Sequence, residues 1–488
     1  MLKNRANERF NPEELDKLLL QNNLEELKTQ LLKIFWGPCA LSGFKNCDKY
    51  IFAFPEEEIK ATPYLSTAAA IICSIYGDLN KAREYAQCVD QIEFMRLHLD
   101  IIIPARNNNK FWHAVRKLSS NADYMKPNLP IAAGRVSLIN GFRDLSEYRD
   151  FIKGHKGEVK KCLSALYGDS AIGMYEVAYA EICYMEDDCF GAIASLVGNI
   201  PIIEQNGEVA VLFVALYLQM RIMIATGQIA VLYPMLDQIY NKITSTDSRW
   251  LTENHNALRA WGAMYDNDIT EVKKWLENES PNEYGRLCMT DVFRYMIKMR
   301  AYLIEGKYYS VVAIGELLRK ILQDGHRVID LCELNLLCAI AYYSGGKCDE
   351  AYGLMDEVIK VAKKRKLDRL IADEGEKAYL LLRDYKRNRN NKDVGLNSYI
   401  NHLIALSKKM ALLYPDYLKE CRKDFPSLTE TEREVLQLMA NERTNSEIAY
   451  FMGISINTVK FHSKNIYKKL SVNNRRRAVK VAKENNIL

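Results

Sequence analysis

The chain has 488 residues, of which 48% are hydrophobic and 26% charged, a balance that is usual for folded globular protein and excludes wholesale disorder. Its 12 prolines and 24 glycines are few for this length, which favours long helices over many tight turns. The net charge is only +5, yet residues 424–488 hold 11 basic and 7 acidic residues, so a net of +4 lies in the last eighth of the chain. This distribution indicates that the C-terminal segment, rather than the near-neutral remainder, meets a polyanion.

The first part of the chain, 1–64, is predicted to be a helical segment. Its start, Met1–Phe10, has no apolar stretch of the kind that marks a signal peptide. The longest apolar run, Val209–Leu218, is too short to span a membrane. The 12 cysteines form no Cys-x-x-Cys pair and mostly lie in apolar stretches, so we expect reduced thiols in a cytoplasmic protein without membrane contact.

Residues 65–413 are predicted to form a repeated helical hairpin. The positions four residues before, two after and five after each candidate turn are all apolar or aromatic, and Gly77 marks an earlier copy with similar flanks. A helix can end at such a turn because glycine and asparagine adopt the left-handed conformation at little cost. Hairpins at this period stack to bury their faces, so we expect a helical-repeat solenoid. The candidate turns, spaced by 40, 40, 39 and 40 residues, are Asp187, Gly227, Asn267, Gly306 and Gly346.

Residues 414–427 contain Pro415 and Pro426 and are predicted to link the repeats to a small domain at 428–488. There, Thr429 and Glu432 have the spacing of a capping box that opens a helix. Two helices joined by a Gly turn, the second of them basic, form the helix-turn-helix pattern. The expected elements after the first helix are a short helix following Asn445, a turn at 453–455, a third helix over 456–470 and a fourth that begins at Asn473 or Asn474.

The third helix has one basic face. At about 100° per residue, its apolar positions and one serine fall on one side, and a basic arc falls on the other. The apolar side holds Val459, Ser463, Ile466 and Leu470, and the basic arc holds Asn457, Lys460, Phe461, Lys464 and Lys468. The helix has four lysines and no acidic residue, whereas an ordinary solvated face mixes both signs. Such a face can neutralise phosphates in the major groove of double-stranded DNA.

We therefore predict two sets of DNA-contacting residues. Lys460 and Lys464 are expected to reach guanine acceptors, and Phe461 is expected to contact a thymine methyl group. The residues expected to contact the DNA backbone are Asn445, Ser455, Asn457, Thr458, Lys468, Lys469, Arg475 and Arg476.

The motifs at 428–436, 444–449, 453–460, 465–470 and 474–475 together resemble the LuxR-type DNA-binding domain over about 60 residues. The resemblance places Asn445–Lys464 as the helix-turn-helix proper, with Lys460, Phe461 and Lys464 where that family contacts bases. Two departures are Glu442, where the family usually has Gly, and Arg476-Arg477, where a Thr-Glu pair is more usual. The second departure adds positive charge and favours stronger non-specific binding to DNA.

The repeats resemble, more loosely, the tetratricopeptide (TPR)-like sensor region of the MalT-like members of that family, although the period is longer than the usual one. Those relatives carry an ATP-binding domain ahead of the repeats, but this sequence contains no Gly-x-x-x-x-Gly-Lys-Ser/Thr motif. Ser344–Lys347 is a repeat turn rather than a phosphate loop. We therefore expect a MalT-like regulator without the ATP-binding domain and without a cofactor.

The predicted fold is thus all-α: a TPR-like solenoid followed by a four-helix LuxR-type domain. The seven histidines show no metal-ligand spacing and no catalytic motif was found, so we expect a bacterial transcriptional regulator and not an enzyme. Expected partners are double-stranded DNA, a second copy of the chain on a two-fold site, RNA polymerase, and a small-molecule or protein effector on the repeats. The alternative is a protein-interaction scaffold, or the partner of a separate ATPase, that binds DNA only weakly.

Overall fold

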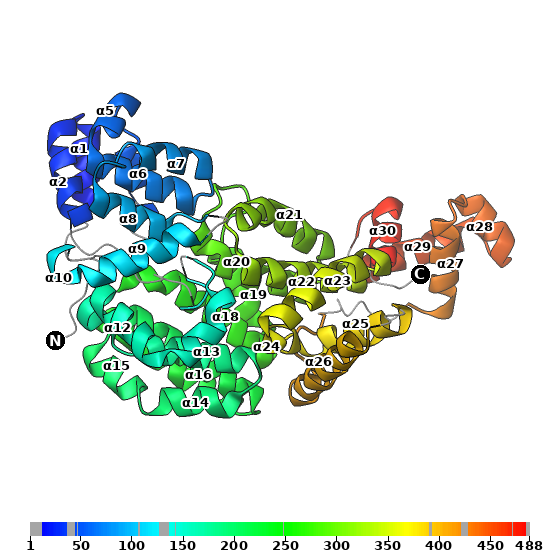
Figure 1. The fold of residues 1–488 in the computed structure, drawn as a ribbon. Helices are drawn as coiled ribbons and strands as arrows, with labels where there is room; N and C mark the ends of the chain where they lie inside the picture. The colour runs from blue at the N-terminus through cyan, green and yellow to red at the C-terminus, as the bar shows by residue number, and fades with distance from the viewer. Residues whose placement is uncertain are drawn as a thin grey trace. The chain divides into compact units, whose positions relative to one another are not determined.

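The computed structural model describes residues 12–36, 44–45, 47–105, 108–125, 136–141, 143–246, 248–389, 393–420, 428–470 and 472–484. The chain divides into two compact units, Met1–Lys419 and Glu420–Leu488, which we call the body and the C-terminal unit. The described residues form helices and no β-strand, apart from one isolated antiparallel bridge between Asn140 and Asp144 (Figure 1). The predicted all-α fold class is confirmed.

The N-terminal helices share one core with the helices that follow them. Leu15, Leu27 and Leu31 are buried in the same apolar cluster as Leu65 and Ala69, so the body has no boundary at residues 64 and 65, where the sequence analysis placed one. Pro63 occupies the first turn of its helix, a position that needs no backbone N–H donor. These helices are α1 (Pro12–Leu20), α2 (Leu24–Trp36), α4 (Asp48–Ile51), α5 (Glu56–Ala61), α6 (Pro63–Ile75), α7 (Leu79–Gln87) and α8 (Glu93–Ile102).

Shorter helices connect this part to the central hairpins. They are α9 (Asn109–Ser120), α10 (Ala122–Met125), α11 (Arg149–Gly154) and α12 (Lys156–Tyr167), with single 3-10 turns at Ser146–Tyr148 and Gly168–Ala171. Arg143 contacts the end of α8, because its guanidinium donates to the carbonyl oxygens of Ile101 and Ile103 at 3.2 and 2.7 Å.

The central body is a succession of helical hairpins, and each predicted turn lies between two helices (Figure 1). All six turn residues have positive φ, from 55° at Asn267 to 82° at Gly227. At each turn the N–H of the following residue donates to the carbonyl of the residue four before the turn, as from Asp188 to Cys183 at 2.8 Å. This is the hydrogen bond of a left-handed helix cap, so the hairpin prediction is confirmed at the level of the backbone.

The hairpins that carry the five evenly spaced turns are α13 (Met174–Met185) with α14 (Cys189–Val197), α16 (Val209–Ala225) with α17 (Leu232–Ser245), α18 (Thr252–Tyr265) with α19 (Ile269–Asn278), α20 (Val292–Ile304) with α21 (Tyr308–Asp324), and α22 (Val328–Ser344) with α23 (Cys348–Arg365). The helix α15 (Ile200–Asn206) lies between α14 and α16. Helices α17, α18 and α20 are each preceded directly by a single 3-10 turn, at Ile229–Val231, Arg249–Leu251 and Met289–Asp291.

The position five residues after each turn is buried in every copy. In three copies it is alanine, which allows two helices to approach closely. After three of the six turns an aspartate carboxylate caps the second helix, as where Asp268 accepts from the Glu271 N–H at 3.1 Å. The buried residues at this position are Ala82, Ala192, Leu232, Val272, Val311 and Ala351.

The body ends later than the sequence analysis predicted. Helices α24 (Asp368–Ala372), α25 (Gly375–Asn388) and α26 (Val394–Leu413) are followed by two tyrosines that pack into the body instead of a linker. Tyr414 donates to the Ile224 carbonyl oxygen at 2.9 Å, and the Tyr417 ring stacks on Tyr265 with 3.9 Å between centroids. Helix α26 ends before Pro415, but the burial of these rings keeps the residues after it in the body, which ends at Lys419.

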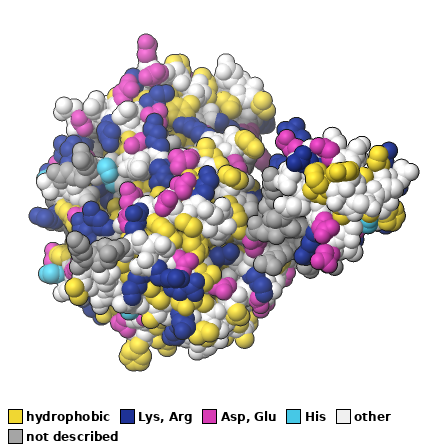
Figure 2. Space-filling view, turned by 90° about the vertical axis from the view of Figure 1, so that its right-hand side faces the viewer, with side chains coloured by type: hydrophobic (Ala, Val, Ile, Leu, Met, Phe, Trp, Pro, Cys, Tyr) yellow, Lys and Arg dark blue, Asp and Glu magenta, His cyan; other side chains and the backbone are white. Residues whose placement is uncertain are grey.

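The face of the body in Figure 2 shows basic and acidic side chains of both signs across its surface, in keeping with the near-zero net charge of this part of the sequence. In the part of the chain that the structure describes, no helix is long and apolar enough to cross a membrane.

The C-terminal unit consists of four helices around a small core. They are α27 (Glu430–Ala440), α28 (Asn445–Met452), α29 (Ile456–Lys469) and α30 (Arg475–Glu484). Val435, Ile448, Val459 and Ile466 are fully buried at its centre. Residues 471 and 485–488 and the side chain of Lys483 lie outside the described part of this unit.

Candidate nucleic-acid interface

The C-terminal unit is built around two capping boxes. In α27, the Thr429 N–H donates to Glu432 Oε2 at 2.7 Å, and the Glu432 N–H donates to Thr429 Oγ1 at 3.3 Å, as predicted. In α28, Thr444 and Glu447 make the same two bonds at the same lengths. This second box was not predicted from the sequence, although Thr444 and Glu447 have the same spacing as the first pair. The helix was predicted to follow Asn445, but it begins at Asn445, one residue earlier.

The turn between α28 and α29 sets the angle between the two helices. Gly453 has φ of 66°, the left-handed conformation that closes α28, and the Ile454 N–H donates to the Ala449 carbonyl oxygen at 3.1 Å. Ser455 then caps α29 by accepting from the Thr458 N–H at 3.1 Å. The Ser455 and Thr458 hydroxyl oxygens lie 2.8 Å apart, so one hydroxyl donates to the other and the second keeps its proton for an outside acceptor.

The buried side of α29 is the side that its periodicity predicts. Val459, Ile466 and Leu470 are at most 1% exposed. Ser463 is also buried there, and its hydroxyl donates to the Val459 carbonyl oxygen at 2.7 Å, which removes the cost of an unbonded polar group in the core.

The opposite side of α29 is exposed and basic. Phe461 is 62% exposed, which is unusual for a phenylalanine in a small domain. The other members of this arc are also exposed: Asn457, Lys460, Lys464 and Lys468. We call these five residues the basic face of α29. Since α29 has no acidic residue, no carboxylate of its own helix offsets these ammonium groups.

Lys469, the neighbour of Lys468, has a different environment. Its ammonium lies 2.6 Å from Glu432 Oε2 and joins α29 to α27. Burial by itself raises the pKa of Glu432, but the Lys469 ammonium and the Thr429 N–H outweigh it and hold that pKa below its usual value. Lys469 is therefore engaged inside the unit, unlike the basic face.

Arg475 also makes contacts within the unit. Its guanidinium donates to the carbonyl oxygens of Met439 and Arg443 at 2.9 and 2.5 Å, at the end of α27 and the loop after it. A cation at this place complements the negative end of the helix dipole. Arg476 and Arg477, by contrast, are exposed on α30. Asn445 is half-buried at the first position of α28 and not at its cap.

Among the residues that the structure describes, no group of three His, Cys, Asp or Glu side chains is placed to hold a metal ion. The chemistry of the C-terminal unit is therefore that of an exposed array of ammonium groups beside two helix N-termini, which suits a polyanion with regularly spaced phosphates.

Comparison with known proteins identifies this unit. Residues 426–482 match the family described as bacterial regulatory proteins, luxR family. The chain is 48% identical over 71 residues to the probable transcriptional regulatory protein SgaR of Hyphomicrobium methylovorum, a match that covers 14% of this chain and 34% of that protein. The chain thus carries a luxR-family helix-turn-helix domain in its C-terminal unit.

Other relatives are also similar over a short part of the chain. The transcriptional activator protein EchR of Dickeya chrysanthemi is 33% identical over 90 residues, which cover 18% of this chain and 36% of EchR. The response regulator protein VraR of Staphylococcus saprophyticus is 41% identical over 71 residues, which cover 14% of this chain and 34% of VraR. The chain therefore spans only about a third of the length of these curated relatives.

Proposed function

We propose that this protein is a DNA-binding transcriptional regulator whose helix α29 enters the major groove of double-stranded DNA. The observation that carries this proposal is the basic face of α29, which is exposed opposite a buried, largely apolar face. The three lysines of this face, on a helix without an acidic residue, supply the charge for phosphate neutralisation. The luxR-family match supports the same function and favours regulation over catalysis.

The base contacts are assigned to the N-terminal and middle part of α29. Lys460 and Lys464 are one turn apart and donate to guanine O6 and N7, while Phe461 packs against a thymine methyl group. The 62% exposure of the Phe461 side chain supports this role, because its apolar surface is covered only when a partner binds.

The backbone contacts are assigned to the residues around this centre. The hydroxyl proton left over from the Ser455–Thr458 pair donates to a phosphate, as do Asn457 and Lys468. Asn445 offers the N-terminus of α28 to a second phosphate, and Arg476 reaches the backbone from α30. Lys469 and Arg475 are assigned to holding the unit together, since both are already bonded inside it.

The regulator is proposed to act as a dimer on a two-fold site, with half-sites about 34 Å apart. The body, as a MalT-like helical-repeat domain without an ATP site, is proposed to sense an effector and to control the DNA-bound state, with RNA polymerase as a further partner. The hairpins at a period of about 40 residues support a repeat domain of this kind.

Footprinting of the full chain on fragments of its source genome tests the DNA-binding proposal. A sequence-specific protected site is expected, with an affinity that falls steeply with salt. Lys464→Ala should lose the footprint, whereas Lys320→Ala, an exposed lysine on α21 of the body, should keep it. Weak binding without a protected site and without salt dependence would overturn the proposal and favour a protein-interaction scaffold.

A further inference from the structure

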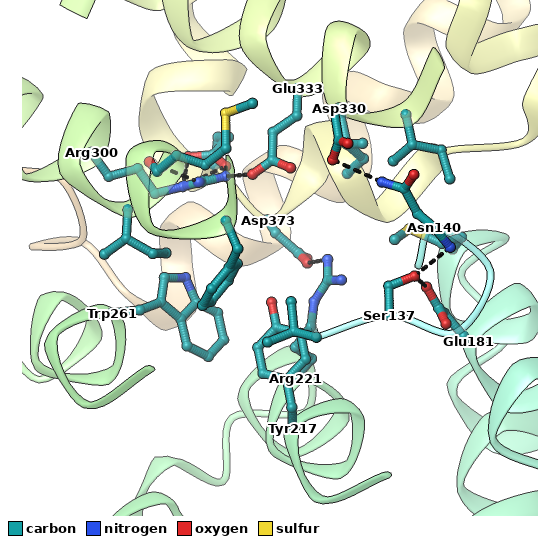
Figure 3. Close-up of a pocket in the computed structure, with 18 of the residues that line it drawn as sticks. Ser137, Asn140, Glu181, Tyr217, Arg221, Trp261, Arg300, Asp330, Glu333 and Asp373 are labelled. Atoms are coloured by element: carbon teal, nitrogen blue, oxygen red, sulfur yellow. Dashed lines mark hydrogen bonds and ion pairs between the residues drawn. The ribbon is translucent and has the colours of Figure 1, made fainter. Parts of the chain in front are cut away.

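The body contains a cavity of about 80 Å³, lined by residues of all five hairpins, of the segment 136–141, and of the chain after the last hairpin. One water needs about 10–15 Å³ by this measure, so the space admits several waters or one small ligand. Four of its lining residues occupy the same place in successive repeats, six residues before the turn. This column consists of Glu181, Arg221, Trp261 and Arg300 (Figure 3).

One side of the cavity is aromatic. Trp261 is 5% exposed, and its ring meets Tyr217 edge-on with 5.6 Å between centroids. Phe293 meets the same tyrosine at 6.0 Å and also lines the cavity. Ring faces of this kind attract cations and alkyl groups alike.

The two arginines of the cavity are already paired with carboxylates. Arg221 Nη2 lies 2.7 Å from Asp373 Oδ2, and Arg300 contacts Glu374 and also Glu333, whose Oε1 is 2.8 Å away. An arginine held by buried carboxylates is poorly placed to attract an anion as well.

Carboxylates outnumber guanidinium groups around the cavity. Five carboxylates line it: Glu181, Asp330, Glu333, Asp373 and Glu374. Four arginines pair with these groups, since Arg327 lies 2.9 Å from Asp330 and Arg369 lies 2.5 Å from Asp373. One negative charge is therefore left over when all five are ionised.

The carboxylate without an ion pair among the described residues is that of Glu181, which is 5% exposed. It accepts from the Ser137 hydroxyl and from the Leu138 and Ile139 N–H groups at 3.0 and 3.2 Å. Burial raises the pKa of Glu181, which these bonds only partly offset. A cation in the cavity would favour its charged form.

A second side chain, that of Asn140, indicates that the cavity binds a group that donates a hydrogen bond. Asn140 is 4% exposed and held on three sides: its side-chain amide donates to Asp330 at 2.8 Å, its N–H donates to Ser137 Oγ at 2.7 Å, and its carbonyl accepts from Arg327 at 2.7 Å. Its side-chain oxygen Oδ1 is buried and has no hydrogen-bond partner within the described part of the chain. A buried acceptor of this kind is rarely left without a donor.

We propose that this cavity binds a small alkylammonium ion, a protonated primary amine. Figure 3 shows Trp261 on one side of the cavity and Asn140 and Glu181 on the other, with Glu333 and Asp373 between them. The ammonium group donates to Asn140 Oδ1 and to the Glu181 carboxylate, and the alkyl part packs against Trp261. The inference rests on the proposed function, because it names the chemical class of the effector that the body senses.

The test uses the full chain and three probes of similar size: butylammonium chloride, sodium butyrate and 1-butanol. Binding is followed by saturation-transfer NMR of the probe methyl signal and by calorimetry. Butylammonium is expected to bind at least tenfold more tightly than the other two, and Glu181→Gln is expected to weaken it at least tenfold. Glu316→Gln, which changes an exposed carboxylate on α21, serves as the matched control and should bind like the wild type.

The proposal is overturned if butylammonium does not bind, if butyrate or butanol binds equally well, or if Glu181→Gln binds as tightly as the wild type. Should that variant fail to fold by circular dichroism, Glu333→Gln decides in the same way, because Glu333 shares Arg300 with Glu374. The footprint is measured without any probe, so the two proposals fail separately. A footprint without amine binding refutes only the amine site, and amine binding without a footprint refutes only the regulator.

Discussion

Lys468 and Lys469 are adjacent in the sequence, yet the structure predicts opposite consequences for their replacement by alanine. Lys468 belongs to the exposed basic face of α29, whereas Lys469 contacts Glu432 at 2.6 Å. We expect Lys468→Ala to leave stability within about 0.5 kcal/mol of the wild type, as is usual for an exposed surface change. Each phosphate contact contributes about 0.9 to the slope of log affinity against log salt. In a dimer, Lys468→Ala should therefore lower the slope by about 1.8.

Lys469→Ala should instead reduce stability. It removes the ammonium from a carboxylate that is 3% exposed, which costs about 1–3 kcal/mol for a buried acceptor that loses its partner. The lower part of this range is expected, because Glu432 keeps its bond from the Thr429 N–H and because Lys469 is itself a quarter exposed. The salt slope should not change, since Lys469 does not face DNA in the proposed complex.

Two measurements decide between these expectations: urea unfolding of the full chain, followed by the signal of the C-terminal unit, and electrophoretic mobility shifts on the footprinted site from 50 to 200 mM salt. Each lysine variant serves as the control for the other. The reasoning is refuted if Lys469→Ala lowers the salt slope as much as Lys468→Ala, or if Lys468→Ala is the more destabilised of the two.

Three further changes have defined outcomes. Phe461→Ala should alter base preference at one position of the selected site more than it lowers overall affinity, as measured by selection from random DNA. Ala192→Leu overfills a fully buried hairpin contact and should destabilise the body by about 1–3 kcal/mol in urea unfolding, whereas an unchanged midpoint would contradict close packing there. Burial raises the folded-state pKa of Glu181, so its contribution to stability falls as pH rises above the ordinary value of 4.5. Glu181→Gln should remove that loss, and a variant with the same pH profile as the wild type would argue against it.

The hairpin turns could be predicted from the sequence because they depend on local chemistry. In these hairpins a left-handed residue closes the first helix, and Gly77, Gly227 and Asn267 are residue types that accept this conformation. Asp187 accepts it as well, with φ of 64°. The apolar flanks of each turn then follow from the short distance between the two helices that it joins.

The unit boundaries could not be predicted because they depend on contacts between distant segments. No sequence pattern near Tyr417 predicts that its ring stacks on Tyr265, which is 152 residues earlier in the chain. Likewise, Leu27 and Leu65 share a core although the segment between them has no periodic pattern that joins the two. Proline-based linker prediction weighs only the backbone, and at Pro415 the burial of neighbouring aromatic rings dominates.

On the basic face of α29, the helical period alone was sufficient, because exposure on a short helix follows directly from angle. Residue type alone does not distinguish Lys468 from Lys469, since both are lysines at the end of the same helix. Their difference comes from Glu432, which the first capping box fixes beneath one of them. A residue that caps its own helix can thus also neutralise a basic residue on another, and this second role requires the tertiary fold.

The position of the cavity column depends partly on the local sequence and partly on the tertiary fold. Its members lie six residues before successive turns, a register that the sequence contains but that apolar patterning does not reveal, because Glu181, Arg221 and Arg300 are charged. In a stacked array of hairpins, equivalent positions on the first helices come together, so charges about 40 residues apart become neighbours. Buried charge is costly unless it is paired or functional. Among the described residues, the pairing here leaves one carboxylate without an ion pair and one amide oxygen without a hydrogen-bond partner. Polar residues that recur at one register before the turns of a helical repeat are therefore candidates for a ligand site, and the amine titration tests that rule on this chain.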